Sequence, residues 1–137
     1  METSRALSLP PNPRDDEILS AVEAWVADLV RGDYSSAIAR TEHDPYYGWT
    51  ADLLRRVVEG YGVAEPRPRG SFRVTAPAGA RGEKRAWVDR EAVPPGALAV
   101  AGYDLPLNGE WSDLTATFRM EPRAGAACLV LEEVHVF

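Results

Sequence analysis

The sequence has little of the residues that build disulfides and metal sites: one cysteine, Cys128, and two histidines, His43 and His135. A lone cysteine cannot form a disulfide within the chain, so nothing in the sequence indicates an oxidising compartment. The spacing of these three residues matches no metal-binding motif, and we therefore predict no metal site. Because Cys128 lies in an apolar run, we expect a small buried side chain of a strand rather than a reactive thiol.

Long apolar segments are also absent. No stretch approaches the roughly 18 apolar residues that a membrane helix needs, and residues 1–5 show no apolar core of a signal peptide. The sequence contains no P-loop, no dinucleotide-binding glycine motif and no nucleophile elbow. We therefore expect a cytoplasmic protein that needs no cofactor and does not enter a membrane.

The charge is unevenly distributed along the chain, whose net charge is −6. Residues 1–64 carry 6 basic and 11 acidic side chains, residues 65–90 carry 7 and 3, and residues 91–137 carry 2 and 7. An acidic chain lacks the basic field that nucleic-acid binding needs, so we predict no nucleic-acid partner. The basic middle segment either forms a local basic band or is a solvated edge, and the second interpretation is the simpler one.

The 137 residues fit one domain. We predict a loose arm over residues 1–11 and a single α+β domain over residues 12–137. Apolar residues at three- and four-residue spacing predict an amphipathic helix over 13–31. Asn12 is expected to cap it and Pro13 to occupy its first position.

Two shorter helices are predicted next. Asp33 can cap a helix that runs to Arg40, and Thr50 can cap a third helix that ends at Gly60 and Gly62. Residues 65–70 predict a stiff, extended connector between the helical part and the strands.

The apolar period then changes to two. Residues 72–75 and 86–89 alternate around a turn at 76–82 and predict a hairpin. A third strand is expected over 98–105, and Asn108-Gly109 predicts a tight turn into a fourth. The last strand, 128–137, has its alternation interrupted by Glu132-Glu133, which predicts a bulge.

The fourth strand, 113–120, has two distinct faces. We expect its apolar row to face the helices and its polar row to face water. The apolar row is Leu114, Ala116, Phe118 and Met120, and the polar row is Asp113, Thr115, Thr117 and Arg119. Helices followed by strands predict an α+β fold in which the helices pack on one face of a curved antiparallel sheet.

Two stretches resemble known families. Residues 25–37, WVADLVRGDYSSA, resemble the first helix and turn of NTF2-like (cystatin-like α+β) proteins. Residues 103–115, YDLPLNGEWSDLT, resemble a bacterial domain family of unknown function, which brings no assigned activity. The NTF2-like resemblance implies a cone with a cavity between sheet and helices, and homodimers through the sheet. That fold hosts isomerases, dehydratases, immunity proteins and binding modules, so it does not decide the function.

The segment 43–49 is the first candidate site. His43 can act as a base oriented by Asp44, with Tyr46, Tyr47 and Trp49 as the walls of a small-molecule pocket. The alternative is that the three aromatic residues fill the open end of the sheet as core, and we favour it.

Asp104 and Asp113 flank the Asn108-Gly109 turn and form the second candidate. If the strands pair there, the two carboxyl groups lie close together, which raises one pKa and permits acid–base chemistry. The alternative is that they cap turns. Trp111, between them, is a candidate ligand-binding residue. Glu133 and His135 share a face of the last strand and are a weaker candidate pair.

Three functions follow. The first is a non-catalytic binding or interaction module for a protein partner or small apolar ligand; its acidic charge suits an immunity-type protein that neutralises a basic toxin. The alternative is a cofactor-independent isomerase or cyclase that uses a pocket histidine or aspartate. The third is a homodimerisation domain, with Thr115, Thr117 and Arg119 as the dimer face.

Overall fold

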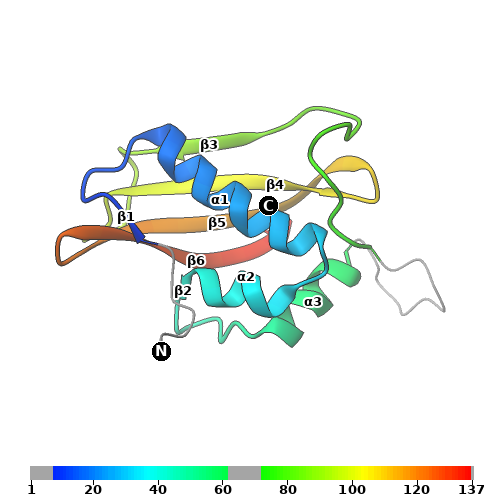
Figure 1. The fold of residues 1–137 in the computed structure, drawn as a ribbon, viewed down its shortest axis with the longest axis horizontal. Coiled ribbons are helices and arrows are strands. Elements are labelled where there is room, and N and C mark those ends of the chain that lie inside the picture. Colours follow the sequence, from blue (N-terminus) through cyan, green and yellow to red (C-terminus); the bar gives the residue numbers. More distant parts are fainter. Residues whose placement is uncertain (1–7, 62–71, 137) are drawn as a thin grey trace.

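The computed structural model describes residues 8–61 and 72–136, which form an α+β fold of helices and one sheet (Figure 1). The helices are α1 (Asp15–Val30), α2 (Tyr34–Arg40) and α3 (Ala51–Glu59). The strands are β1 (Ser8–Leu9), β2 (Glu42–His43), β3 (Ala86–Asp89), β4 (Ala99–Leu107), β5 (Glu110–Arg123) and β6 (Ala126–Val136). The predicted fold class is therefore confirmed at this level.

The sheet is open, with the strand order β1-β6-β5-β4-β3. All neighbours on this path are antiparallel. The short strand β2 also pairs with β6, in the parallel direction, through Glu42 opposite Val130 and His43 opposite Leu131. The segment 8–9, predicted as part of a loose arm, is paired here, with Leu9 opposite Ala127.

The first helix carries the predicted apolar stripe, buried against the sheet. It begins at Asp15, so the predicted start at Asn12 and Pro13 is wrong. Arg14 takes the capping position instead, and its backbone N–H donates to the Glu17 carboxylate over 2.8 Å. The glutamate thereby satisfies a free amide at this helix end, the duty expected of Asn12.

The predicted caps of the other two helices are confirmed. The Asp33 side chain accepts from the backbone N–H of Ser36, and the Thr50 hydroxyl accepts from that of Leu53. One buried charge joins α1 to α2: Asp28 is fully buried, and Arg40 Nε donates to it over 2.6 Å. Arg31 also donates to Asp28.

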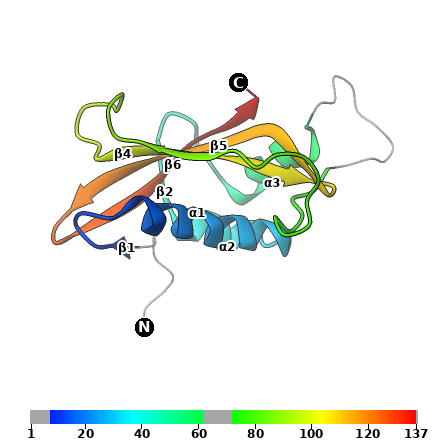
Figure 2. The same ribbon diagram turned by 90° about the horizontal axis from the view of Figure 1, so that it is seen from above.

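The helices α1 and α2 lie on one side of the sheet, as Figure 2 shows. The apolar row of β5 faces α1 as predicted, and the rings of Trp25 and Phe118 meet edge to face at 5.1 Å. The polar row is not the exposed face that we expected, because Thr115 and Thr117 are only 5% and 8% exposed. Side chains from the segment after β2 reach over the part of this second face where Arg119 and Glu133 lie.

The strand pairing corrects one prediction and confirms two. Residues 72–75 form no hairpin with 86–89: β3 pairs with β4, and of the first segment Val74 makes an isolated bridge to Leu107. Asn108 and Gly109 both have positive φ, as the tight turn between β4 and β5 requires. The register of β5 against β6 shifts at Glu132, which is the predicted bulge.

Two further predictions concern parts of the chain outside the described residues. These are the connector at 65–70 and the helix end at Gly62. Among the described residues, the helices are too short and too polar to traverse a bilayer.

Candidate interaction surface

His43 lies in β2 and its ring is used to join β2 to α2. Its Nε2 lies 2.8 Å from the carbonyl oxygen of Ile38, so this nitrogen carries the proton and donates it. One of the two ring nitrogens of His43 is therefore engaged with the backbone of α2.

Asp44 follows directly and points to a different partner. Its carboxylate accepts from Arg119 Nη1 over 2.7 Å and from the backbone N–H of Tyr46 over 2.9 Å. The hydrogen bond from Arg119, with that of the backbone amide, holds the pKa of Asp44 below its usual value. The structure therefore brings Asp44 to an arginine rather than to His43.

The three aromatic residues of this segment differ in exposure. Trp49 is buried, and its Nε1–H donates to the carbonyl oxygen of Glu132 over 2.9 Å. Tyr47 is half-buried and its hydroxyl donates to the Glu133 carboxylate. That hydrogen bond raises the pKa of Tyr47 to about 12. Tyr46 meets Tyr47 edge to face at 4.9 Å and is 85% exposed.

Arg119 is the centre of an ion-pair cluster on the second face of the sheet, the face turned away from α1. Its guanidinium bonds Asp44 at 2.7 Å, Glu121 at 2.7 Å and Glu132 at 3.1 Å. Its side chain is only 15% exposed. Burial alone would lower the pKa of Arg119, but the bonds to three carboxylates outweigh burial and raise it. This cluster fixes the segment after β2 to the centre of the sheet.

Asp104 and Asp113 are not opposite each other, because the register places Thr115 opposite Asp104. Asp104 is buried, accepts from the Thr115 hydroxyl over 2.8 Å and lies 3.7 Å from Arg85 Nε. Asp113 is exposed and accepts from the hydroxyl of Tyr61. The two carboxyl groups thus serve separate contacts.

Trp111 is half-buried and packs with the core rather than standing alone. Its ring lies 6.1 Å from that of Tyr103, and its backbone N–H donates to the carbonyl oxygen of Arg81 over 2.9 Å.

A continuous row of residues crosses the second face of the sheet. Strand pairing places Trp87 of β3 opposite Gly102 of β4, Gly102 opposite Thr117 of β5, and Thr117 opposite Glu133 of β6. Directly opposed residues of neighbouring strands share a face. Because Phe118 contacts Trp25 of α1, its neighbour Thr117 points away from α1, and so does the whole row. We call the face that this row crosses the outer face.

The predicted pair Glu133 and His135 lies on the outer face too. His135 Nε2 is 3.4 Å from Glu133 Oε1, while the other oxygen of Glu133 accepts from Tyr47. His135 is opposite Thr115, one step along the strands from the row.

Acidic side chains outnumber basic ones on the outer face. Strand register, or a bond to Arg85, Arg119 or Arg123, places several carboxylates on this face. They are Glu42, Asp44, Asp89, Asp104, Glu121, Glu132 and Glu133. The three guanidinium groups of Arg85, Arg119 and Arg123 are paired with members of this set. The face therefore carries an excess of negative charge.

Four cations in the described part of the basic middle segment pair with carboxylates from elsewhere in the chain. Arg81 bonds Glu110 at 3.0 Å, Lys84 bonds Glu23 at 2.8 Å and Arg90 bonds Asp15 at 2.8 Å. Arg85 approaches Asp104, as described above. These four cations are therefore held in ion pairs rather than in an open basic band.

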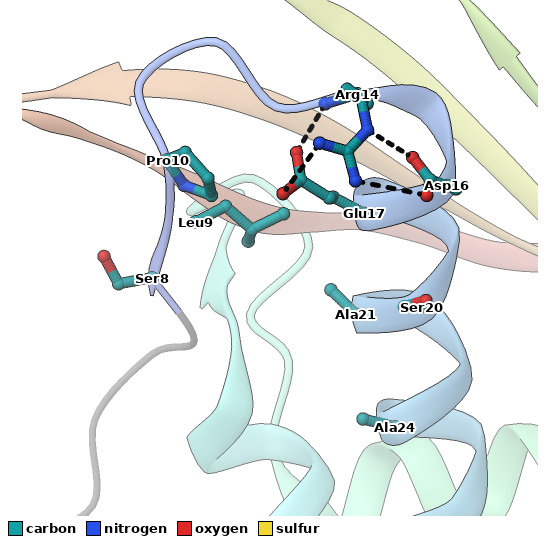
Figure 3. A pocket seen from close by; sticks show the side chains of 9 residues that line it. All are labelled: Ser8, Leu9, Pro10, Arg14, Asp16, Glu17, Ser20, Ala21 and Ala24. Carbon is teal, nitrogen blue, oxygen red and sulfur yellow. Dashed lines mark hydrogen bonds and ion pairs between the residues drawn. The ribbon is translucent and has the colours of Figure 1, made fainter.

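An open groove of about 510 Å³ lies between β1 and α1. Figure 3 shows Leu9 and Pro10 on one side and Ala21 and Ala24 of α1 on the other. Arg14, above them, is bonded to Asp16 and Glu17 of the same helix. A second groove of about 360 Å³ lies at the start of α2 and α3. Neither groove is lined by His43, Asp44, Asp104 or Asp113.

Within residues 8–61 and 72–136, no set of three or more histidine, cysteine or acidic residues is arranged to hold a metal ion. Comparisons of the chain with protein-family models, with curated proteins and with solved structures find no match. The resemblance to NTF2-like proteins accordingly stays a prediction.

Sequence reasoning did not single out Trp87 and Gly102. Two signals pointed to them. The alternation in 86–89 separates Trp87 and Asp89 from Ala86 and Val88. Gly102 is an isolated glycine in an otherwise regular strand, which marks a close approach by another group.

Proposed function

We propose that this chain is a non-catalytic interaction module that binds a basic protein partner through its outer face. The observation that carries the proposal is the bonding of the four predicted catalytic residues. His43 bonds the backbone of α2, Asp44 bonds Arg119, Asp104 bonds Thr115, and Asp113 bonds Tyr61. Each group thus has a structural partner that holds it in place.

The character of the outer face supports a protein partner. It combines an excess of carboxylates with a large exposed aromatic side chain, Trp87, which is 39% exposed. Tryptophan is enriched among the residues that dominate binding energy at protein interfaces. An acidic field favours encounter with a basic partner and accelerates it. An immunity-type protein that neutralises a basic toxin has this chemistry, and we propose it as the kind of module.

Self-association through the same face is the less favourable assignment. A two-fold axis would place the same acidic patch on both sides of the interface. Like charges that face each other across an interface cost free energy. The enzyme alternative, an isomerase or cyclase, needs one of the four residues free to act on a substrate, whereas each of them bonds a structural partner.

The test is site-specific photo-crosslinking in cells that naturally make the protein. A photo-reactive residue replaces Trp87 in one variant and Val136 in a control. Val136 is 48% exposed but lies opposite Leu114, whose side chain is on the α1 face. The proposal expects a basic protein to be captured from position 87 and not from 136.

The captured protein is then purified and its affinity measured by calorimetry. We expect the Trp87→Ala variant to bind it at least ~10-fold more weakly, as loss of a central aromatic anchor does, and Val136→Ala to bind as the unaltered chain does. Equal capture at both positions, or an acidic partner, or unchanged affinity of Trp87→Ala would contradict the proposal.

A further inference from the structure

We propose that the partner anchors on the outer face through an arginine whose guanidinium stacks on the indole of Trp87. This inference rests on the proposed function and names the chemical group that the surface takes. Three features carry it: the orientation of the indole, the lack of a side chain at Gly102, and the charge around both.

The indole of Trp87 lies flat over Gly102. A Cβ atom built on Gly102 would lie 2.1 Å from Cζ2, 2.4 Å from Cε2 and 2.4 Å from Cη2 of Trp87. Since three atoms of the six-membered ring are almost equally distant from this point, the ring meets Gly102 face-on. Its opposite face is turned away from the sheet, and Trp87 keeps 39% of its surface exposed. The result is a flat aromatic platform on the outer face.

Gly102 is what makes this orientation possible. No side chain larger than hydrogen fits there while the Trp87 ring keeps this position, because distances of 2.1–2.4 Å are far below any real carbon contact. An isolated glycine weakens a strand interior because it contributes no side chain to packing. Here the ring of Trp87 packs where a side chain of residue 102 would otherwise lie.

The charge of the outer face selects a cation for the platform. Asp89 follows Trp87 by two residues on the same face, and Glu133 lies two strands away in the row. Neighbouring strands lie about 4.8 Å apart, so Glu133 is about 10 Å from Gly102. A long basic side chain stacked on Trp87, or the residue next to it in the partner, can reach that distance. A cation over an indole is attracted by the electron density of the ring, and nearby carboxylates add to this attraction.

Arginine fits this arrangement better than lysine. A guanidinium is planar, so it stacks on an aromatic face while its edge donates in the plane to a carboxylate. It is also less strongly hydrated than an ammonium group, so less is lost when it leaves water.

The experiment follows the indole N–H signals of the full chain in ¹⁵N–¹H NMR spectra. The Trp87 signal is identified by its absence from the spectrum of Trp87→Ala. The probes are acetylated tetra-arginine, tetra-lysine and tetra-proline peptides at low salt. We expect saturable shifts of the Trp87 signal with tetra-arginine, and at least ~3-fold weaker binding of tetra-lysine and of tetra-proline.

Two variants and one control complete the test. Trp87→Ala should bind tetra-arginine about 5–10-fold more weakly, as loss of a stacked cation–ring contact predicts. Gly102→Ala keeps the tryptophan but displaces its ring, so it should weaken binding in the same direction. Val136→Ala should bind as the unaltered chain does. Circular dichroism of each variant confirms that it is folded.

The inference is overturned if the Trp87 signal does not respond to tetra-arginine, if tetra-proline binds as tightly, or if Trp87→Ala binds tetra-arginine unchanged. Its failure is distinguishable from failure of the proposed function. If a captured partner depends on Trp87 but the peptides show no preference for arginine, the proposed function stands and the arginine contact is refuted. If tetra-arginine binds selectively but no basic partner is captured, the arginine-binding platform stands and the proposed function is refuted.

Discussion

Replacing Arg119 by methionine removes the cation that holds three carboxylates on the outer face. The side chain is 15% exposed, and its partners Asp44, Glu121 and Glu132 are 21%, 26% and 25% exposed. Charge-assisted hydrogen bonds contribute about 1.5–3 kcal/mol each where they are buried. Because the carboxylates can regain water in the variant, we expect a total loss of about 2–3 kcal/mol in the free energy of unfolding at pH 7.

The loss depends on pH in a defined direction. The Arg119 bond holds the pKa of Asp44 below its usual value, so this carboxylate stabilises the fold above the pKa of an unfolded aspartate, about 3.9. That stability disappears as the pH falls through the lowered pKa. In the variant, Asp44 loses this bond, so this part of the stability is absent at every pH. The difference between the two proteins should therefore be largest above about pH 5 and shrink below pH 4.

Urea unfolding followed by circular dichroism, at pH 7 and at several values down to pH 3.5, measures both effects. The matched control is Arg123→Met, the same substitution on the same strand. Arg123 is 40% exposed and pairs with Glu42 and Glu121, so it should cost less than about 1 kcal/mol. If Arg119→Met costs no more than the control, or if its cost does not change with pH, the cluster does not hold this face together.

Three further predictions concern single buried groups. Asp28→Ala should lower the free energy of unfolding by about 2–4 kcal/mol in urea, because it leaves Arg40 without its buried partner; an unchanged midpoint would exclude a role for this pair in joining α1 to α2. Trp49→Phe should cost about 1–2 kcal/mol in the same assay, because the carbonyl oxygen of Glu132 loses its donor; a cost equal to that of a surface substitution would contradict the bond. Cys128 should react with a thiol reagent at pH 8 only after unfolding, since burial raises the pKa of its thiol to about 11; fast reaction of the native protein would show that β6 is accessible there.

Features controlled by neighbouring residues could be predicted from the sequence. The apolar stripe of α1, the caps at Asp33 and Thr50, and the Asn108-Gly109 turn each depend on a few consecutive residues. The bulge at Glu132 is of the same kind, because a break in alternation is visible within the strand itself. The exception is the start of α1, which lies at Asp15 rather than at Pro13, with Glu17 accepting from the backbone N–H of Arg14.

Features that depend on distant residues could not be predicted. The segment 86–89 alternates equally well against residues 72–75 and against β4, and periodicity does not distinguish the two partners. The position of Asp104 opposite Thr115 depends on a register shift that the turn sequence does not reveal. The same limit applies to the candidate site, since the Trp87 platform exists only because Gly102 lies opposite it on the neighbouring strand.

The outer edge of β6 has a consequence for how the chain folds during synthesis. Two early segments, Ser8–Leu9 and Glu42–His43, find their pairing partners on a strand that is made more than eighty residues after them. A ribosome adds about 5–20 residues per second, so these segments and the helices between them are synthesised several seconds before the strand with which they pair. During most of that interval the apolar stripe of α1 has no sheet to cover it, because β5, against which it packs, is made directly before β6. Chaperones that shield nascent apolar helices should therefore be engaged by this chain until β6 has left the exit tunnel.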